Sequence, residues 1–392
     1  MSTKKIRIFS AIPLPLGSDS WNRDITLIYR GLKKIGVESQ CVRLHAKDGV
    51  NFPGIIQADL NNMKDPLWWK AFGLDGVVLS SWLRPAYSPI VSAIKSAGAK
   101  VLVRTDSNGI NSPWVNPYAY FRSNYIRMRN KRNTLLSFIA STMKTFLYAI
   151  PSVYDLKMLD HMEMADAIST ESEDSLAYFE KLLQFYNRPD LYKKFHLIRH
   201  PVIMNATAEP QDYHLEKSRP KKIISVADWR RYGKNKPLLI KTLLRVSEMH
   251  PDYKTDIIGH YGDIPKELEQ HPRIIIRGNI KYEDIGKYYN QSRILFLPTL
   301  QESGPLVLSE ALCHGCSCVL PNSATVPSHY VRTNNFGSLS ANYSAQAFSA
   351  AITKEITAWE KEERSSCEIA RKSRKVFDYT CIAEQIVKIL SE

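Results

Sequence analysis

The chain contains 392 residues, which predicts two globular domains because most domains have about 100 to 200 residues. Hydrophobic residues make up 44% and charged residues 23% of the sequence, and these values exclude both a disordered chain and a polytopic membrane protein. Lys and Arg total 53 against 39 Asp and Glu, so the formal net charge is +14. This excess predicts anionic partners, such as phosphates, a membrane surface or nucleic acid.

Short β-rich runs alternate with helical patterns in the first part of the chain. The predicted strands lie at 6–12, 76–79 and 100–104, and the predicted helices cover 22–35 and a segment that ends at Ala97. Repeated strand and helix units of this kind form a parallel sheet covered by helices. We therefore assign residues 1–204 to an N-terminal Rossmann-like domain.

The same alternation resumes after a polar, proline-containing stretch. The predicted strands lie at 223–226, 254–258, 274–277, 294–297 and 318–321, and one of the intervening helices begins near Pro237. We place a linker at 205–220, a second Rossmann-like domain at 221–378 and a final amphipathic helix at 379–392.

Residues 107–154 differ from the rest of the chain. These 48 residues contain no Asp or Glu but six Lys and Arg, and many are Phe or Tyr. We favour an anionic membrane surface as the partner of this segment, because its aromatic residues lie beside an apolar stretch. A nucleic-acid backbone would suit the same charges, and an ordinary solvated face is a third interpretation.

The chain lacks the sequence signals of a membrane-spanning or secreted protein. No uninterrupted run of about 18 apolar residues is present. Pro13 and Pro15 interrupt the apolar run near the N-terminus, so we expect a first strand there rather than a signal peptide. The six cysteines form no evident disulfide framework. We expect a cytoplasmic protein that can bind peripherally to the inner face of the membrane.

Several nucleotide and metal motifs are absent from the sequence. There is no Gly-x-Gly pair and no Gly-Lys-Ser/Thr, so the usual signatures of hydride transfer and of ATP hydrolysis are missing. There is also no Asp-x-Asp pair that could hold a divalent metal, and we expect the nearest pattern, Glu171-Ser-Glu173, to begin a helix. The cysteines at 313, 316 and 318 with His314 have metal-ligand chemistry, but we expect small buried side chains there rather than a zinc site.

The segment 300–315 is the candidate ligand site. Because a predicted strand precedes it, Glu302 lies at the carboxyl end of that strand, where open α/β sheets bind ligands. Backbone N–H groups at the start of the following helix can bind a phosphate, and the residues concerned are Ser303, Gly304, Leu306 and Val307, with Pro305 suited to the first helical turn. Glu310 comes two turns after Glu302, which predicts two carboxylates on one side of the helix. Two carboxylates beside a phosphate suit a ligand with vicinal hydroxyl groups.

This pattern resembles the E-x7-E motif of retaining GT-B glycosyltransferases, in particular glycosyltransferase family four. Glu302 and Glu310 are separated by seven residues, and Ala311-Leu312 and Gly315 follow them. Similar segments in the second half of the chain are 223–227, 234–240, 276–280 and 316–323. The resemblance implies an α/β protein of GT-B fold, in which two Rossmann-like domains with parallel sheets face a central cleft. It implies that the N-terminal domain, 1–204, binds the acceptor and that the C-terminal domain, 221–378, binds the nucleotide sugar. It also implies that the last helix crosses back to the N-terminal domain.

The resemblance assigns roles to residues of the C-terminal domain. Glu302 would lie beside the donor sugar and Glu310 beside the ribose hydroxyls. Lys234, with Lys236 as its competitor, would neutralise the diphosphate leaving group. Either Arg230 or Arg231 would share this role. Fixed cations and helix N–H groups can stabilise the developing negative charge without a metal.

The resemblance makes three further residues candidates. Gly278 would lie in the loop near the base of the donor. Gly17 follows the first strand and can allow close approach of a diphosphate. Asp106 stands where relatives often have a His, and it could contact the donor sugar or the acceptor.

The implied activity is that of a metal-independent glycosyltransferase (EC 2.4) with no cofactor besides its donor. It would move a sugar from a UDP- or GDP-linked nucleotide sugar to a hydroxyl group of a glycan or lipid-linked glycan, with retention of configuration, in the synthesis of a surface polysaccharide. Two alternatives are a catalytically silent GT-B module that binds a glycan or nucleotide, and a glycosyltransferase that modifies nucleic acid.

Overall fold

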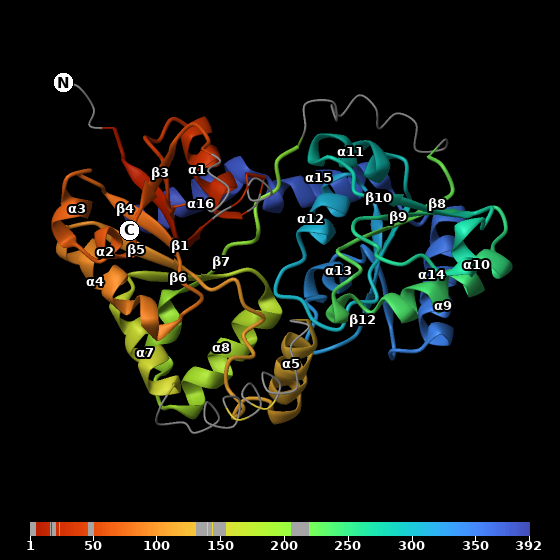
Figure 1. Cartoon of the computed structure of the whole chain (residues 1–392), viewed down its shortest axis with the longest axis horizontal. Coiled ribbons are helices and arrows are strands. Elements are labelled where there is room, and N and C mark those ends of the chain that lie inside the picture. The colour runs from red at the N-terminus through yellow and green to blue at the C-terminus, as the bar shows by residue number, and fades with distance from the viewer. Residues whose placement is uncertain are drawn as a thin grey trace. The chain divides into compact units, whose positions relative to one another are not determined.

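The computed structural model describes residues 5–15, 17, 21–22, 24–45, 51–130, 139, 143, 154–204 and 219–392. The chain divides into two compact units (Figure 1). Unit 1 consists of Met1–Val115, Met143–Ile203 and Val376–Glu392, and unit 2 consists of Asn116–Thr142 and Met204–Lys375. Each unit contains one parallel sheet with helices packed against it, as the alternating pattern of the sequence predicts.

The sheet of unit 1 has seven strands in the order β3-β2-β1-β4-β5-β6-β7. Their bounds are β1 Ile8–Pro15, β2 Cys41–Leu44, β3 Ile55–Ala58, β4 Gly76–Ser80, β5 Lys100–Arg104, β6 Ala167–Thr170 and β7 Phe195–Leu197. Both faces of this sheet are buried: along β1, Phe9 and Ala11 belong to one apolar cluster, while Ile8 and Ile12 belong to another. This alternation with a period of two residues is the geometry of a strand with helices on both sides.

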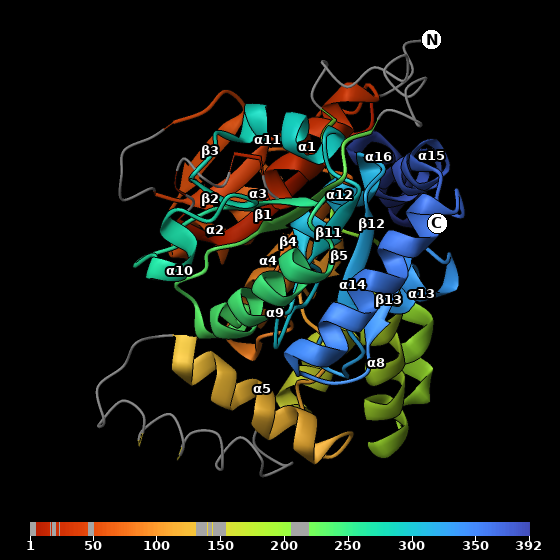
Figure 2. The same cartoon turned by 90° about the vertical axis from the view of Figure 1, so that its right-hand side faces the viewer.

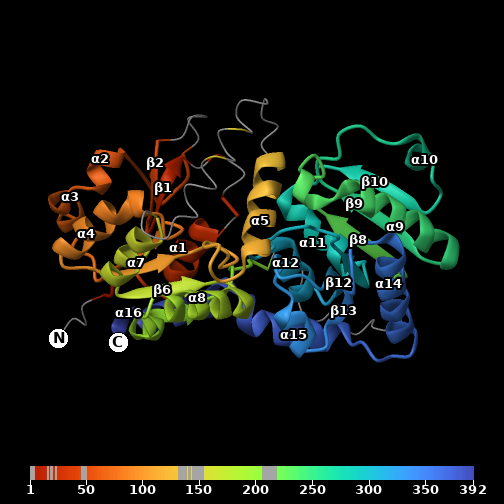
Figure 3. The same ribbon diagram turned by 90° about the horizontal axis from the view of Figure 1, so that it is seen from below.

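The helices of unit 1 are α1 Asp24–Lys34, α2 Leu60–Met63, α3 Pro66–Lys70, η2 Pro85–Tyr87, α4 Ser88–Ser96, α7 Asp155–Met164, α8 Glu173–Phe185, η3 Pro189–Lys194 and α16 Tyr379–Ser391. The helix α8 lies along β6 (Figure 3). The C-terminal helix α16 packs on α1 within this unit. Gly31 makes this close approach possible, because a Cβ atom there would lie 2.3 Å from the carbonyl oxygen of Tyr379.

The sheet of unit 2 has six strands in the order β10-β9-β8-β11-β12-β13. Their bounds are β8 Lys222–Val226, β9 Lys254–Ile258, β10 Ile274–Gly278, β11 Ile294–Phe296, β12 Ser317–Pro321 and β13 Gly337–Ser340. The helices are α5 Pro117–Asn130, η5 Tyr232–Lys234, α9 Lys236–Met249, α10 Lys266–Glu269, α11 Tyr282–Asn290, α12 Leu306–Cys313, α13 His329–Thr333 and α14 Ala345–Glu360, and α15 Ser366–Phe377 ends at the boundary of the units. The helices α9 and α14 lie side by side (Figure 2).

Two features differ from the sequence analysis. The helix α5 groups with unit 2, although its residues fall within the segment that we assigned to the N-terminal domain. The strand β1 continues through Pro13 and Pro15 instead of ending at Ile12. The two prolines are tolerated because β4 pairs only with residues Ile8 to Ala11 of β1, and because the pairing with β2 shifts register between Ile12 and Pro15.

The segments that we assigned to the linker and to the apolar part of the basic segment fall mostly outside the described residues, which omit 205–218, 131–138 and most of 140–153. Among the residues that are described, no helix is long and apolar enough to cross a membrane.

Candidate functional site

The candidate ligand segment forms a loop followed by a helix. β11 ends at Phe296 and α12 begins at Leu306, with Pro305 as its N-cap residue. Glu302 therefore lies in the loop, and Glu310 lies on the helix. Our expectation that both carboxylates share one side of a helix is wrong, because the proline ends the extended segment and the first helical residue comes only after it.

The first turn of α12 offers backbone donors. The N–H of Leu308 donates to the carbonyl of Pro305 at 2.9 Å, so intrahelical hydrogen bonding begins there. The N–H groups of Leu306 and Val307 precede this bond and belong to the set that a helix cannot satisfy internally. Ser303, Gly304, Leu306 and Val307 are partly exposed, whereas Pro305 is buried. The residues that we named as phosphate donors thus lie in the loop before α12 and in its first turn.

Lys234 and Glu302 form an ion pair in this loop region. The Nζ atom of Lys234 donates to the Oε1 atom of Glu302, and the two side chains are only 21% and 15% exposed. The hydroxyl of the buried Thr299 lies 3.0 Å from the same Oε1 atom. The carboxylate of Glu302 is therefore held from two sides, and it fixes the position of the ammonium group.

Hydrogen bonds connect the two loops that carry this pair. The N–H of Leu300 donates to the carbonyl of Gly233 at 2.7 Å, and the side chain of Asn235 donates to the carbonyl of Pro298 at 3.2 Å. Asn235 adopts the left-handed conformation, with φ 57°, which Asn tolerates better than most residues. The loops follow β8 and β11, which are neighbours in the sheet. The pair thus lies at the carboxyl edge of a parallel sheet, the usual ligand-binding edge.

Lys236 and the two arginines have other partners. The ammonium group of Lys236 donates to the carbonyls of Tyr261 and Asp263 at 3.1 and 3.3 Å, away from Glu302. Arg230 donates twice to Asp228, at 2.8 and 3.1 Å. Arg231 lies 3.4 Å from the same carboxylate, and its side chain is 61% exposed against 46% for Arg230.

Asp228 is the common partner of both arginines. The hydrogen bond from Arg230 lowers the pKa of Asp228, and this effect together with the attraction of both guanidinium groups outweighs the opposing effect of burial. The carboxylate thus keeps the two cations close together at the end of β8.

A buried tyrosine orients Glu310. The hydroxyl of Tyr289 in α11 donates to the Oε2 atom of Glu310 at 3.0 Å. Tyr289 is fully buried, and burial together with the adjacent carboxylate raises the pKa of its phenol well above 10. The phenol therefore stays protonated and remains a hydrogen-bond donor.

Gly278 ends β10 and has φ 67°. Its carbonyl accepts the N–H of Gly259 at 2.8 Å, and no atom lies within 4 Å of a Cβ built at this position. The conformation rather than lack of space favours glycine here.

The predicted residues Gly17 and Asp106 belong to unit 1. Gly17 follows the end of β1 and is partly exposed. Asp106 follows β5 and has φ 38°, a left-handed conformation that is uncommon outside glycine. Its carboxylate lies 3.3 Å from His200 Nε2 and accepts a hydrogen bond from the indole of Trp82 at 3.4 Å.

Asp106 borders a buried charge cluster that the sequence analysis did not identify, formed by Asp24, Arg104, Glu171 and His200. Arg104 donates twice to Asp24, at 3.0 and 2.8 Å, and lies 3.6 Å from Glu171. His200 contacts Asp24 at 3.0 Å through Nδ1. These side chains follow the ends of β5, β6 and β7 or begin α1, so they meet at the carboxyl edge of the sheet.

The protonation states of this cluster follow from its burial and its charges. Burial lowers the pKa of His200, but Asp24 and Asp106 outweigh it and raise the value to about 10. Burial raises the pKa of Asp24, but Arg104 and His200 outweigh it and bring the value well below its usual range. Burial raises the pKa of Glu171 despite the nearby Arg104. The buried His200 is therefore a cation at neutral pH.

No group of three His, Cys, Asp or Glu side chains among the described residues is arranged as a metal site. Cys313, Cys316 and Cys318 are buried thiols, and the thiol of Cys316 donates toward the carbonyls of Tyr289 and Ser292 at 3.3 and 3.2 Å.

Residues 208–373 match the protein-family model described as Glycosyl transferases group 1. Three solved structures of similar architecture extend over nearly the whole chain. Anabaena HepE in complex with UDP shares 13% identity, covers 98% of this chain and 100% of its own, and has a TM-score of 0.66. A glycosyltransferase from Rickettsia africae shares 16% identity, with coverages of 99% and 98% and a TM-score of 0.64. Sucrose-phosphate synthase from Thermosynechococcus elongatus shares 14% identity, with coverages of 98% and 98% and a TM-score of 0.59.

A comparison with curated proteins finds no match. The structural likenesses show a GT-B fold with two Rossmann-like parallel-sheet domains, and the predicted fold class is confirmed at that level. The matched segment marks residues 208–373 as a glycosyltransferase group 1 domain, which indicates that the protein is a glycosyltransferase.

Proposed function

We propose that the protein transfers a sugar from a nucleoside diphosphate sugar to a hydroxyl group of an acceptor. The observation that carries the proposal is the ion pair of Lys234 and Glu302 in the loops that precede α9 and α12, within the glycosyltransferase group 1 domain. HepE has been solved with UDP and with UDP-glucose, and this supports a UDP-linked donor, with a GDP-linked donor as the alternative.

Lys234 would stabilise the diphosphate leaving group. An ammonium group has three N–H donors, and the contact with Glu302 uses one of them. The other two can donate to phosphate oxygens while Glu302 keeps the group in place. The N–H groups at the start of α12 would add donors and the positive end of the helix dipole. Of the two arginines, Arg231 has the weaker contact with Asp228 and the greater exposure, so it is better able to turn toward a phosphate.

The two glutamates would bind hydroxyl groups of the donor. Glu302 accepts from Lys234 through Oε1, and its Oε2 atom would accept from a hydroxyl of the transferred sugar. Glu310, held by Tyr289, would accept hydrogen bonds from the ribose. In the reaction, the bond between the anomeric carbon and the phosphate oxygen breaks, the acceptor oxygen bonds to that carbon, and the acceptor proton leaves with the diphosphate.

We further propose that the reaction retains the anomeric configuration and needs no divalent metal. Lys234 and Arg231 are cations that can balance the charge of a departing diphosphate, which is the task that a metal ion performs in other enzymes of this chemistry. Product configuration determined by NMR, and activity in the presence of EDTA, test these two statements separately. An inverted product or loss of activity in EDTA would contradict them.

The acceptor is proposed to be a glycan or lipid-linked glycan of a surface polysaccharide, and the enzyme to act in the cytoplasm at the membrane face. The excess of basic residues supports attraction to an anionic bilayer. Sedimentation with vesicles of neutral and of anionic lipid tests this proposal. Binding to oligonucleotides but not to anionic vesicles would instead favour a nucleic-acid substrate.

Calorimetric titration with UDP, GDP and ADP tests the donor site. We expect one nucleotide to bind selectively and both Glu310→Ala and Lys234→Ala to weaken its binding. Lys236→Ala is the matched control, because it removes a neighbouring ammonium group that contacts a different loop. If no nucleotide binds, the protein is a silent module rather than a transferase.

A further inference from the structure

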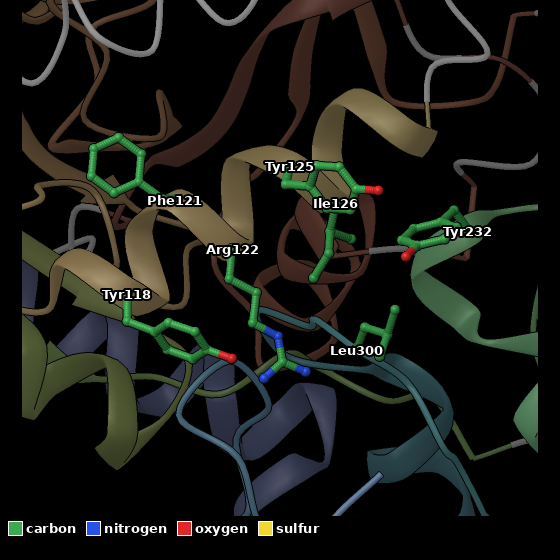
Figure 4. A pocket seen from close by; sticks show the side chains of 7 residues that line it. All are labelled: Tyr118, Phe121, Arg122, Tyr125, Ile126, Tyr232 and Leu300. Carbon is green, nitrogen blue, oxygen red and sulfur yellow. The ribbon is translucent and has the colours of Figure 1, made fainter. Parts of the chain in front are cut away.

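One face of α5 lines a pocket in unit 2. Tyr118, Phe121, Arg122 and Tyr125 are spaced by three or four residues, so they lie on one side of the helix. Together with Tyr232 and Leu300 from the two loops of the candidate site, they line a pocket of about 520 Å³ (Figure 4). In this view Tyr118, Arg122 and Tyr125 extend toward the side of Tyr232 and Leu300, whereas the ring of Phe121 points away from them.

The pocket wall is fixed to the site loops. The side chain of Gln301 donates to the hydroxyl of Ser123 at 2.5 Å, and the N–H of Gly233 donates to the side chain of Asn130 at 2.8 Å. Ile126 is buried and packs against Gly233. A Cβ atom added to Gly233 would lie 3.1 Å from the Cγ2 methyl group of Ile126. Two hydrogen bonds and one tight apolar contact thus hold α5 in register with the loops.

The pocket shares its loops with the ion pair. Tyr232 precedes Lys234 by two residues, and Leu300 precedes Glu302 by two residues. A hydrogen bond of 2.7 Å joins Leu300 to Gly233, which lies between Tyr232 and Lys234. A ligand in the pocket would therefore lie next to the groups that we propose to hold the donor.

The lining is aromatic and mainly apolar. Tyr118, Tyr125 and Tyr232 are 73%, 42% and 39% exposed, so their rings are accessible although they lie in a wall. The rings of Tyr125 and Tyr232 meet edge to face at 6.1 Å. Arg129 lies over the ring of Tyr232 at 5.0 Å, which restricts the ring's orientation.

This combination matches one ligand chemistry best. The pocket surface is mainly apolar, and its polar groups are those of the tyrosines and of Arg122, whose guanidinium lies over the ring of Tyr343 at 4.7 Å. A sugar ring has an apolar C–H face that can cover a tyrosine ring and a rim of hydroxyls that can bond phenols and Arg122. Tyr118 and Tyr125 are seven residues apart, about 10 Å along the helix, which suits more than one sugar ring.

We infer that this pocket is the acceptor subsite and that it binds a sugar ring of a glycan acceptor by stacking on the tyrosines of α5. The inference rests on the proposed function, since it names the substrate that receives the sugar. It places acceptor recognition on a helix of unit 2, beside the site loops.

The test measures disaccharide binding and nucleotide binding in the same variants. Maltose, cellobiose and lactose serve as probes in saturation-transfer NMR and calorimetry, and UDP, GDP and ADP serve as the nucleotides. We expect at least one disaccharide to bind the unmodified protein and to bind Tyr125→Ala and Tyr118→Ala about tenfold more weakly, equivalent to about 1.4 kcal/mol.

Two controls separate stacking from unfolding. Tyr125→Phe keeps the ring and should bind the disaccharide within about threefold of the unmodified protein, close to 0.7 kcal/mol. Phe185→Ala removes an aromatic side chain of similar exposure, 48%, from unit 1 and should change nothing. Nucleotide binding should be the same in all these variants.

The inference is overturned if the disaccharide binds Tyr125→Ala as well as it binds the unmodified protein, or if nucleotide binds and no disaccharide does. A third outcome is that geranyl phosphate binds the unmodified protein, does not bind Tyr125→Ala, and no disaccharide binds. In that case the ligand of the pocket is a lipid chain and not a sugar. If disaccharides bind as expected but no nucleotide does, the proposed function fails and the pocket remains a glycan site.

Discussion

The ammonium group of Lys234 donates a hydrogen bond to the carboxylate of Glu302, although 68 residues separate them in the sequence. Each residue lies in a loop after a strand, and the two strands, β8 and β11, are neighbours in the sheet. The pairing of these strands therefore brings a cation and an anion together at the edge where parallel sheets bind ligands. Because Thr299 also contacts Glu302, the pair is preorganised before any ligand arrives.

Lys234→Ala is expected to lower the rate of sugar transfer or donor hydrolysis by about 10² to 10³, the usual effect of removing one group that stabilises developing negative charge. The fold should survive, because the remaining Glu302 keeps its contact with Thr299. The measurement is steady-state hydrolysis of the donor that calorimetry selects. Lys236→Ala should keep nearly full activity, and an equal loss in both variants would contradict the assignment of Lys234.

Tyr289→Phe is expected to weaken nucleotide binding about fivefold, because loss of one hydrogen bond costs about 1 kcal/mol and Glu310 loses the partner that orients it. The effect should appear in the affinity for the nucleotide, measured by calorimetry. Tyr253→Phe is a matched control, since Tyr253 is also buried in unit 2 and its hydroxyl contacts Glu360 at 3.0 Å. Equal losses in both variants would point to a general destabilisation.

Two predicted strands have the observed bounds, β5 at 100–104 and β9 at 254–258. β5 contains the buried apolar run Val101 to Val103, whereas β9 has only Ile257 and Ile258 as apolar residues beside the buried polar Thr255 and Asp256. β6 and β7 were missed, since each has only three or four residues and half of β6 is polar. Ser169 and Thr170 of β6 are buried, and the local sequence pattern does not indicate that these polar residues lie in the interior.

The candidate site was predictable where the chemistry is local. The spacing of Glu302 and Glu310 and the proline before a helix are visible in the sequence, and the structure contains the helix start. The charge cluster of Asp24 and His200 was not predictable, because 176 residues separate these partners. The packing of α5 against the site loops was not predictable either. Its contacts join Ser123 to Gln301 across 178 residues and Asn130 to Gly233 across 103 residues.

Gly31→Ala is expected to destabilise unit 1 by about 3 kcal/mol, the upper end of the usual cost of overpacking. The added Cβ atom would lie 2.3 Å from the carbonyl oxygen of Tyr379, so α1 and α16 would have to separate. Chemical denaturation followed by circular dichroism measures the change. Lys33→Ala alters an exposed residue of the same helix and should be close to neutral. If Gly31→Ala is as stable as Lys33→Ala, α16 does not pack tightly on α1.

The charge cluster of unit 1 predicts a dependence of stability on pH. His200 has a pKa of about 10 in the folded protein against an ordinary value of 6.5, because the carboxylates of Asp24 and Asp106 outweigh the effect of burial. A raised pKa means that the folded state holds the proton more tightly than the unfolded state. The stabilisation is therefore complete below about pH 6.5 and decreases as the pH rises toward 10. The raised pKa of Glu171 acts in the same direction, since the folded state also favours its protonated form.

Denaturation of the unmodified protein and of His200→Gln at several pH values between about 6 and 10 measures this dependence. We expect the unmodified protein to lose stability across this range and His200→Gln to lose less. At the acidic end the variant should be less stable by about 3 kcal/mol, the lower end of the cost of breaking a buried ion pair, because Asp24, whose side chain is 18% exposed, loses one of its two cationic partners. His45→Gln is the control, since His45 is 62% exposed and its ion pair with Asp59 lies at the surface. If His200→Gln and the unmodified protein lose stability in parallel, the proton held by His200 does not contribute to folding, and the cluster stabilises unit 1 through Arg104 and Asp24 alone.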